Sequence, residues 1–177
     1  MRNDINAPDE KSTIKMIKKM SEKLPKFPDG RIDYTNAETC LVISIFIRCK
    51  NEILILKRSD KVGSFRGKRN TVSGYMDEPK SIIEKAFEEI KEELGISPEF
   101  IYSIKIGKKY KTKMSGIKKT WIVHPVVVEL KEKPDLKLDW EHTEFRWIKP
   151  QQIKDFDVVD KLEKAFKNAC TYTDTQK

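Results

Sequence analysis

Three glutamates near the middle of the chain have a spacing that gathers negative charge. Glu89, Glu92 and Glu93 stand at positions i, i+3 and i+4, which places them on one face if this stretch is an α-helix. Like charges at these spacings destabilise a helix by roughly 0.2–0.5 kcal/mol a pair. A divalent cation would offset the repulsion, because Mg²⁺ is held by one or two carboxylates together with substrate phosphates. The spacing therefore indicates a site for Mg²⁺ or Mn²⁺, with a solvated acidic face as the alternative.

The residues around these glutamates predict the element that positions them. Apolar side chains recur with a helical period on the adjoining face, which allows that face to pack on a core; they are Ile83, Ala86, Phe87, Ile90 and Leu94. Gly95, followed closely by Pro98, is typical of a helix end. We therefore expect an amphipathic helix that buries its apolar stripe and presents the three carboxylates beside it.

Residues 74–96 resemble the signature of the Nudix hydrolases, G-x5-E-x7-R-E-U-x-E-E-x-G-U, in which U is a bulky aliphatic residue. Seven of the nine specified positions match without insertion or deletion: Gly74, Glu89, Ile90, Glu92, Glu93, Gly95 and Ile96. Lys80 stands where the pattern has its first Glu, and Glu88 stands where it has Arg. We interpret these departures either as an ion pair of reversed sign or as two ordinary surface charges.

The resemblance implies an enzyme that hydrolyses a nucleoside diphosphate linked to another moiety, by attack of water on phosphorus. Enzymes of this family hold Mg²⁺ or Mn²⁺ with clustered carboxylates. By resemblance, Glu92 and Glu93 are therefore metal ligands, and Glu89 is a ligand or the catalytic base. The backbone carbonyl just before the opening glycine, here that of Ser73, is implied to complete the metal site.

The resemblance also implies a further carboxylate on a loop after the helix, shortly before a Trp on a late strand. Glu141, six residues ahead of Trp147, is our first choice for this metal ligand or base. Glu144 is the second choice and a candidate substrate contact. Upstream of the signature, Arg58 and Arg66 are candidate phosphate contacts, because guanidinium groups bind phosphate through paired hydrogen bonds.

The charge of the chain favours an anionic ligand. The formal net charge is +8 at pH 7, and seven lysines lie within residues 105–119, a stretch without any acidic residue that we call the basic strip. Lys108, Lys109 and Lys111 of the basic strip are candidate substrate contacts. A solvated, lysine-rich hairpin is the alternative interpretation.

A second function stays open at this point, that of a Nudix-fold module that binds a nucleotide or RNA and has weakened catalysis. Lys80 and Glu88 favour it, because a cation near the carboxylates competes with a metal ion. The three retained glutamates favour the enzyme, since a binding module has no need of their mutual repulsion.

Length and composition are those of one α/β domain. The 177 residues suffice to bury a core, and they contain no apolar run of the ~20 residues that a membrane span requires. The N-terminus has no apolar segment typical of a signal peptide, and the three cysteines are odd in number, as expected of reduced thiols in the cytoplasm. The resemblance implies a mixed β-sheet sandwiched between helices at residues 38–155. A helical extension at 1–37 is interpreted as the arm of a homodimer or a substrate lid, and a C-terminal helix and tail at 156–177 is expected to pack on the same domain.

Periodicity and turn residues predict the remaining elements. A helix capped by Ser12 is expected to carry an apolar stripe and to end before Pro25. One closing helix is expected from Pro150 onward, and a basic turn is expected around Gly116. Strands are expected at 40–47 and 52–57, which form a hairpin, and at 71–73, 101–106, 121–130 and 145–148.

Overall fold

Two long parallel strands form the centre of the sheet in the computed structural model, which describes residues 8–113 and 118–171. These strands are β1 (Thr39–Cys49) and β7 (Thr120–Leu130), and they stay in register from Thr39 opposite Thr120 to Arg48 opposite Glu129. The other pairings in the eight-stranded sheet are antiparallel, so the sheet is mixed as predicted.

Six shorter strands complete the sheet. Strands β2 and β4 pair with β1, β5 and β6 pair with β7, and β3 and β8 pair with β2. Their bounds are Glu52–Arg58 for β2, Arg69–Asn70 for β3, Val72–Tyr75 for β4, Ile101–Ile106 for β5, Tyr110–Lys113 for β6 and His142–Ile148 for β8. The pairing of β4 beside β1 matters most for function, because β4 ends in Gly74 and Tyr75 and leads into the signature helix.

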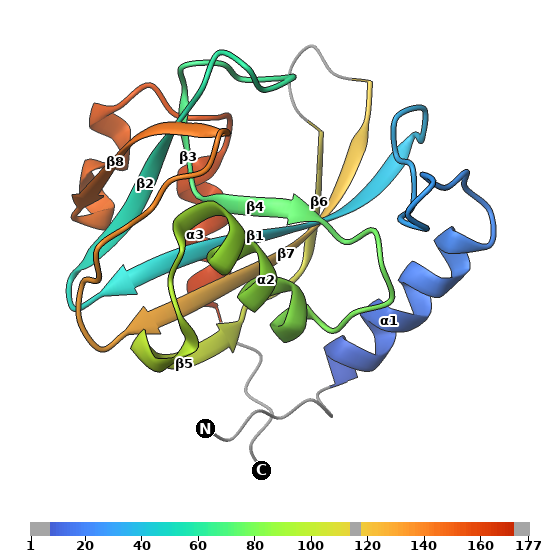
Figure 1. Ribbon diagram of the computed structural model, residues 1–177, viewed down its shortest axis with the longest axis horizontal. Coiled ribbons are helices and arrows are strands. Elements are labelled where there is room, and N and C mark those ends of the chain that lie inside the picture. The colour runs from blue at the N-terminus through green and yellow to red at the C-terminus, as the bar shows by residue number, and fades with distance from the viewer. Residues whose placement is uncertain (1–7, 114–117, 172–177) are drawn as a thin grey trace.

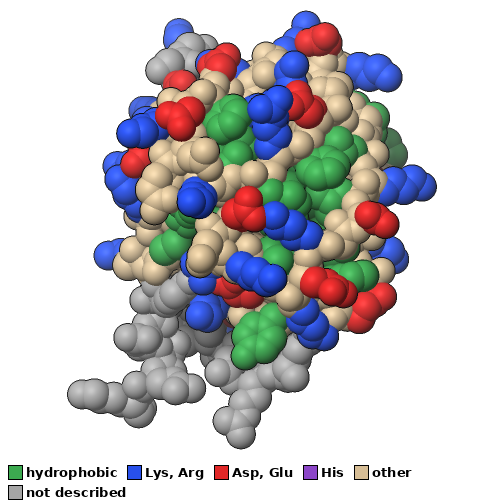
Figure 2. All heavy atoms as spheres, turned by 90° about the vertical axis from the view of Figure 1, so that its left-hand side faces the viewer, with side chains coloured by type: hydrophobic (Ala, Val, Ile, Leu, Met, Phe, Trp, Pro, Cys, Tyr) green, Lys and Arg blue, Asp and Glu red, His purple; other side chains and the backbone are tan. Residues whose placement is uncertain are grey.

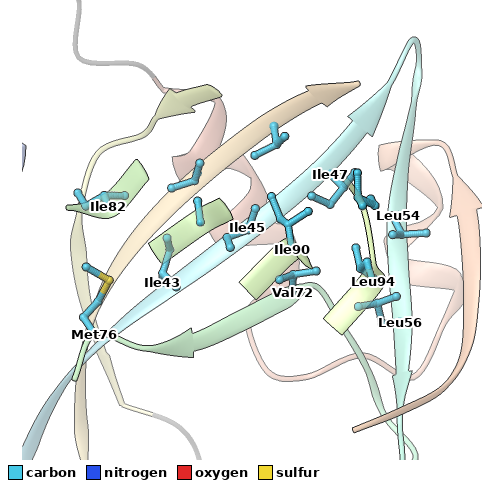
Figure 3. Packing of buried hydrophobic residues seen from close by; sticks show 14 of the residues in the cluster. Ile43, Ile45, Ile47, Leu54, Leu56, Val72, Met76, Ile82, Ile90 and Leu94 are labelled. Atoms are coloured by element: carbon cyan, nitrogen blue, oxygen red, sulfur yellow. The ribbon is translucent and has the colours of Figure 1, made fainter. Parts of the chain in front are cut away.

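Helices cover both faces of the sheet, with α2 (Ile82–Leu94) in front and α3 (Leu162–Cys170) behind in Figure 1. The apolar run of β1 serves both layers, which explains why it does not alternate with polar residues. Ile43, Ile45 and Ile47 lie in the core under α2, where Figure 3 shows them near Ile90. Phe46 points to the opposite face and meets the ring of Phe166 edge-on at 5.2 Å between ring centroids.

Both ends of α2 are fixed by hydrogen bonds that the helix itself cannot supply. Ser81 and Glu84 form a reciprocal capping box at its start, and Gly95 ends the helix in a left-handed conformation with φ of 68°. The side chain of Glu10 adds a second cap, since its oxygens accept the backbone N–H groups of Ile82 at 2.8 Å and Ile83 at 3.3 Å. The buried Glu10 belongs to α1 (Pro8–Ser21), so this first helix is fastened directly to α2.

The structure corrects several expected boundaries. Helix α1 begins at Pro8 instead of Ser12, because Pro is well suited to the first position of a helix. The expected single closing helix is two pieces, the 3₁₀ segment η2 (Pro150–Asp155) and α3, which are separated by an extended stretch. Strand β6 occupies part of the region expected to be a turn, and the turn around Gly116 lies outside the described residues.

The predicted hairpin of β1 and β2 is confirmed, and the strands expected at 71–73, 101–106, 121–130 and 145–148 are present with shifted ends. A further 3₁₀ turn, η1 (Pro98–Phe100), links α2 to β5. Among the described residues, no helix has the length and apolar character that crossing a membrane would require.

Candidate active site

A cavity of about 820 Å³ opens beside α2 and brings together several of the predicted site residues. It lies between β4, α2, the loop that follows β2 and the segment that precedes β8. Five candidates line it: Arg58, Ser73, Glu89, Glu92 and Glu141. Residues far apart in the chain therefore meet where the sequence analysis expected the chemistry.

Gly74 is required by the close approach of β4 to α2. A Cβ atom placed on Gly74 would lie 2.0 Å from Oε1 of Glu89, a separation that no real side chain tolerates. The absence of a side chain at this position therefore makes room for the Glu89 carboxylate at the end of the strand. This contact gives a structural reason for the opening glycine of the signature.

Glu93 is the most buried carboxylate of the site, with 3% of its surface exposed. Its Oε1 accepts the backbone N–H of Ser73 at 3.2 Å, whereas its Oε2 has no hydrogen-bond partner among the described residues. The nearest polar side chain is His142, whose Nδ1 lies 3.6 Å from Oε2. Burial, together with the negative charges of Glu89 and Glu141, raises the pKa of Glu93 well above its usual range.

Glu141 approaches from the turn that precedes β8. The backbone N–H of Glu141 donates to Oδ1 of Asp139 at 3.0 Å, and its carbonyl accepts the N–H of Ser59 at 2.7 Å, which fixes the turn against the end of β2. Burial, and then the charge of Asp139, raises the pKa of the Glu141 carboxyl. His142 next to it is buried, and this burial lowers the pKa of its ring.

Lys85 is a site residue that the sequence analysis missed. The residue is 5% exposed, and its Nζ lies 2.7 Å from Oε1 of Glu89, 3.3 Å from Oε1 of Glu88 and 3.9 Å from Oδ1 of Asp77. Burial lowers the pKa of Lys85, but the contacts with these carboxylates outweigh it and leave the pKa raised. A sequence signal was present, because Lys85 stands four residues before Glu89 on the same helix face.

The two departures from the signature form an ion pair of reversed sign. Nζ of Lys80 lies 2.7 Å from Oε2 of Glu88, which confirms the first of the two interpretations given above. Lys80 also contacts Oε2 of Glu78 at 2.7 Å, and these two carboxylates raise the pKa of the ammonium group. The pair therefore joins the residue before the N-cap of α2 to the second turn of the helix.

Besides Glu93, which is buried beside the cavity, five candidates do not line it: Arg66, Lys108, Lys109, Lys111 and Glu144. In β6 the partly buried Tyr110 and Thr112 line the cavity, and the exposed Lys111 lies between them in sequence, as the alternation of a strand requires. Nε of Arg66 donates to the carbonyl of Val62 at 2.9 Å. A role of these residues in substrate binding stays a prediction.

Glu144 has basic partners of its own on the sheet. Its Oε1 lies 2.8 Å from Nη2 of Arg69 and 2.7 Å from Nε of Arg146. Hydrogen bonds from Arg146 and then Arg69 lower the pKa of Glu144 to about 2. Glu141, the first choice, therefore lies in the cavity, whereas Glu144 is engaged elsewhere.

The carboxylates suit a hard cation in type but are not assembled around one. Within residues 8–113 and 118–171, no three His, Cys, Asp or Glu side chains are arranged as they would be around a bound ion. Glu89 is held by Lys85, and Glu93 is held by the backbone of Ser73. Oε2 of Glu93 has no hydrogen-bond partner among the described residues, and the donors are all oxygen atoms, which suit Mg²⁺ or Mn²⁺.

Comparison with solved structures places this architecture among known proteins. The MutT protein from Methanosarcina mazei Go1 matches with 22% identity and a TM-score of 0.61, over 76% of this chain and 95% of that one. The NUDIX domain of NrtR from Shewanella oneidensis, solved with ADP ribose, matches with 11% identity and a TM-score of 0.62, over 75% and 86%. At these identities the likeness shows the fold alone.

A third neighbour is the dihydroneopterin triphosphate pyrophosphohydrolase of E. coli, with 15% identity and a TM-score of 0.60 over 72% of this chain and 92% of that one. No curated protein matches the chain in sequence. The family model of the NUDIX domain matches residues 39–169, well over half of the chain. The protein therefore belongs to the NUDIX family and has the fold of the Nudix hydrolases, enzymes that act on phosphoric anhydride bonds.

Proposed function

We propose that the protein is a metal-dependent pyrophosphohydrolase that cleaves a nucleoside diphosphate linked to another moiety. The observation that carries this proposal is the carboxylate of Glu93, which is buried beside the cavity and keeps one oxygen without a hydrogen-bond partner among the described residues. A buried, unpartnered carboxylate oxygen is costly unless something binds it. Glu92, which lines the adjoining cavity, would be a further ligand of Mg²⁺ or Mn²⁺, together with the carbonyl of Ser73.

The bound ion would neutralise phosphate charge and lower the pKa of a coordinated water. The chain's own residues would do the remaining work. Glu141 is suited to accept a proton from the attacking water, because a carboxyl whose pKa is raised by burial is a stronger base than an ordinary one. Attack forms a new P–O bond on one phosphorus and breaks the bridging P–O bond, so that two phosphate esters leave.

Substrate groups have suitable partners in the same cavity. Arg58 lines it and is steadied by a hydrogen bond from its Nε to the carbonyl of Ser64 at 3.0 Å, so its remaining N–H groups are available to a phosphate. Tyr75, Tyr110 and Trp121 offer aromatic surface on which a base could stack. The names of similar structures mention ADP ribose and Ap4A, and these compounds support a nucleotide derivative as substrate. An RNA partner and a homodimer gain no support from these comparisons, and a non-catalytic binding module is not favoured.

A substrate screen tests the proposal. ADP-ribose and dinucleoside polyphosphates, which have no terminal phosphate, are incubated with the protein and either Mg²⁺ or Mn²⁺, and products are detected as phosphate after phosphatase treatment. We expect cleavage of at least one compound into two phosphate esters and complete loss of cleavage in excess chelator. A full panel without cleavage, or cleavage that persists in chelator, would contradict the proposal.

A further inference from the structure

Lys85 is a cation buried inside a group of carboxylates. Charged lysines are rarely buried to this extent, and those that are have close partners of opposite charge. Glu89, at 2.7 Å, is the nearest of three carboxylates around the Lys85 ammonium. Lys85 lies one helical turn before Glu89, so the backbone of α2 itself holds the positive charge next to this acid.

The pair belongs to a row of five alternating charges along the wall of the cavity, and every member except Lys80 lines it. From the start of α2 the contacts run from Glu78 to Lys80, then to Glu88, Lys85 and Glu89. Each cation in this row lies between two acids. Lys85 is the cation of this row that lines the cavity, as does Glu92, one of the metal-binding carboxylates proposed above.

The position of Glu89 leaves little room for an ion and the ammonium at once. The same Oε1 atom that contacts Lys85 also lies against the backbone of Gly74, where even a Cβ atom would come within 2.0 Å. An ion that binds this oxygen must take the place of the ammonium, because two cations at one carboxylate oxygen repel each other. Glu93 has no such competitor, since no Lys or Arg of the described residues pairs with it.

We infer that Lys85 is a tethered cation that competes with a divalent ion for Glu89 and thereby weakens the binding of that ion to the site. This inference rests on the proposed function insofar as the cavity binds a divalent ion. It adds a residue outside the signature glutamates that sets the metal requirement of this chain. A purely structural role for the Lys85–Glu89 pair would affect folding stability but not the competition with metal.

Direct measurement of Mn²⁺ binding separates these two roles. The dissociation constant is measured from the free Mn²⁺ signal in electron paramagnetic resonance, without substrate, for the wild type, Lys85→Met, Glu89→Gln and the double variant. We expect Lys85→Met to bind Mn²⁺ at least about tenfold more tightly, the lower end of what groups around metal ligands do to metal affinity. The gain should disappear when Glu89→Gln is also present, because the competed carboxylate is gone.

Lys91→Gln is the matched control for a general loss of positive charge, since Lys91 is an exposed lysine on the same helix. An equal gain in Lys91→Gln, no gain in Lys85→Met, or a gain that persists with Glu89→Gln would each overturn the inference. Lys85→Met leaves Glu89 buried without its cation, so thermal melts with and without Mn²⁺ accompany the titration. A larger Mn²⁺-induced rise in Tm than in the wild type supports the inference, and an equal or smaller rise contradicts it. If Lys85→Met does not fold, Lys85→Gln takes its place in both measurements.

The outcomes also distinguish this inference from the proposed function. Tighter Mn²⁺ binding in Lys85→Met together with no cleavage of any substrate would refute the hydrolase proposal and leave the competition intact. Metal-dependent cleavage by the wild type with no change of affinity in Lys85→Met would refute only the competition.

Discussion

The glutamates of α2 differ in how their charge is balanced, with Glu88 and Glu89 nearer the helix start and Glu93 nearer its end. Glu88 is contacted by Lys80 at 2.7 Å and by Lys85 at 3.3 Å, and Glu89 is contacted by Lys85 at 2.7 Å. One turn later Glu93 is more deeply buried, but its oxygens meet only a backbone N–H and, at 3.6 Å, an imidazole ring. Lysines of the protein therefore balance the charge of Glu88 and Glu89, whereas Glu93 has no such partner among the described residues and is available to a cation from solution.

This difference teaches that a glutamate-rich helix face is not one uniform metal site. The identity of the residue one turn earlier decides whether a carboxylate carries its own counter-ion. At the first end, buried ion pairs hold the helix in place but contribute little net stability, because desolvation opposes their attraction. At the second end, the uncompensated burial of Glu93 is a cost that a bound ion can offset.

The largest expected effect comes from removing the charge of Glu93, the buried glutamate of α2 without a lysine partner in the described part of the chain. Glu93→Gln should reduce turnover with Mn²⁺ by at least about 100-fold, since even groups behind metal ligands affect metal sites by 10–100-fold. Steady-state kinetics on the substrate found in the screen provide the measurement. Glu132→Gln, which changes an exposed acid outside the site, should leave turnover unchanged. Turnover close to that of the wild type in Glu93→Gln would remove Glu93 from the active site.

The same variant has a pH signature in chelator. The pKa of Glu93 is raised in the folded protein, so the folded state holds its proton to higher pH than the unfolded state does. This group therefore makes the wild type less stable as pH rises above the ordinary glutamate pKa. In thermal melts between pH 4 and about pH 8, the Tm of Glu93→Gln should fall less with rising pH than the Tm of the wild type. Parallel curves would show that Glu93 is not the buried acid described here.

A methyl group at Gly74 should disturb the ion pair between Lys85 and Glu89. Gly74→Ala places a carbon where the Glu89 carboxylate lies, so this side chain must move and loses its fixed contact with Lys85. We expect a loss of stability of about 1–3 kcal/mol, the usual cost of overpacking, measured by urea unfolding. Gly63→Ala is the control, because a Cβ atom there meets nothing within 4 Å. Equal stability of the two variants would mean that β4 and α2 do not approach as closely as described.

Removal of the cap that α1 provides should separate helix stability from metal binding. Glu10→Ala leaves the N–H groups of Ile82 and Ile83 without this acceptor, which should cost about 0.5–2 kcal/mol as for other helix caps. Glu10→Gln keeps an acceptor oxygen and should lose less. Mn²⁺ affinity should be unchanged in both variants, because Glu93 lies at the other end of α2. A parallel loss of metal affinity would show that the two ends are coupled.

The smallest expected effect concerns the reversed ion pair. Lys80→Glu places like charges together and should destabilise the protein by roughly 0.2–1 kcal/mol, the range of exposed pairs. Adding Glu88→Arg restores opposite charges, but recovery should be incomplete because Glu88 also contacts Lys85 at 3.3 Å. A double-mutant cycle on unfolding free energy measures the coupling. A coupling of zero would show that the two side chains act independently.

The sequence predicted the parts of the site that depend on local spacing. Glu89 and Glu92 follow from helical periodicity. The Lys80–Glu88 pair and the position of Glu141, with Trp147 as its marker, follow from the resemblance. The same periodicity places Lys85 beside Glu89, so this contact was also predictable from the sequence.

Other features depend on tertiary contacts that a pattern does not contain. The cap from Glu10 joins residues 72 positions apart, and the sequence gives no sign of it. Glu144 lies outside the cavity lining, and its two arginine partners come together only through the pairing of β8 with β2 and β3. The basic strip was treated as one surface, but the alternation of β6 directs its residues to two sides.

The claim that Glu93 is available to a metal ion while Glu89 is occupied by Lys85 is tested most directly by locating the first bound ion. Crystals exposed to Mn²⁺ at less than one equivalent would be measured at a wavelength where manganese scatters anomalously. The account predicts one peak about 2 Å from an oxygen of Glu93, with Lys85 still on Glu89. A peak on Glu89 with Lys85 displaced, and none at Glu93, would contradict it.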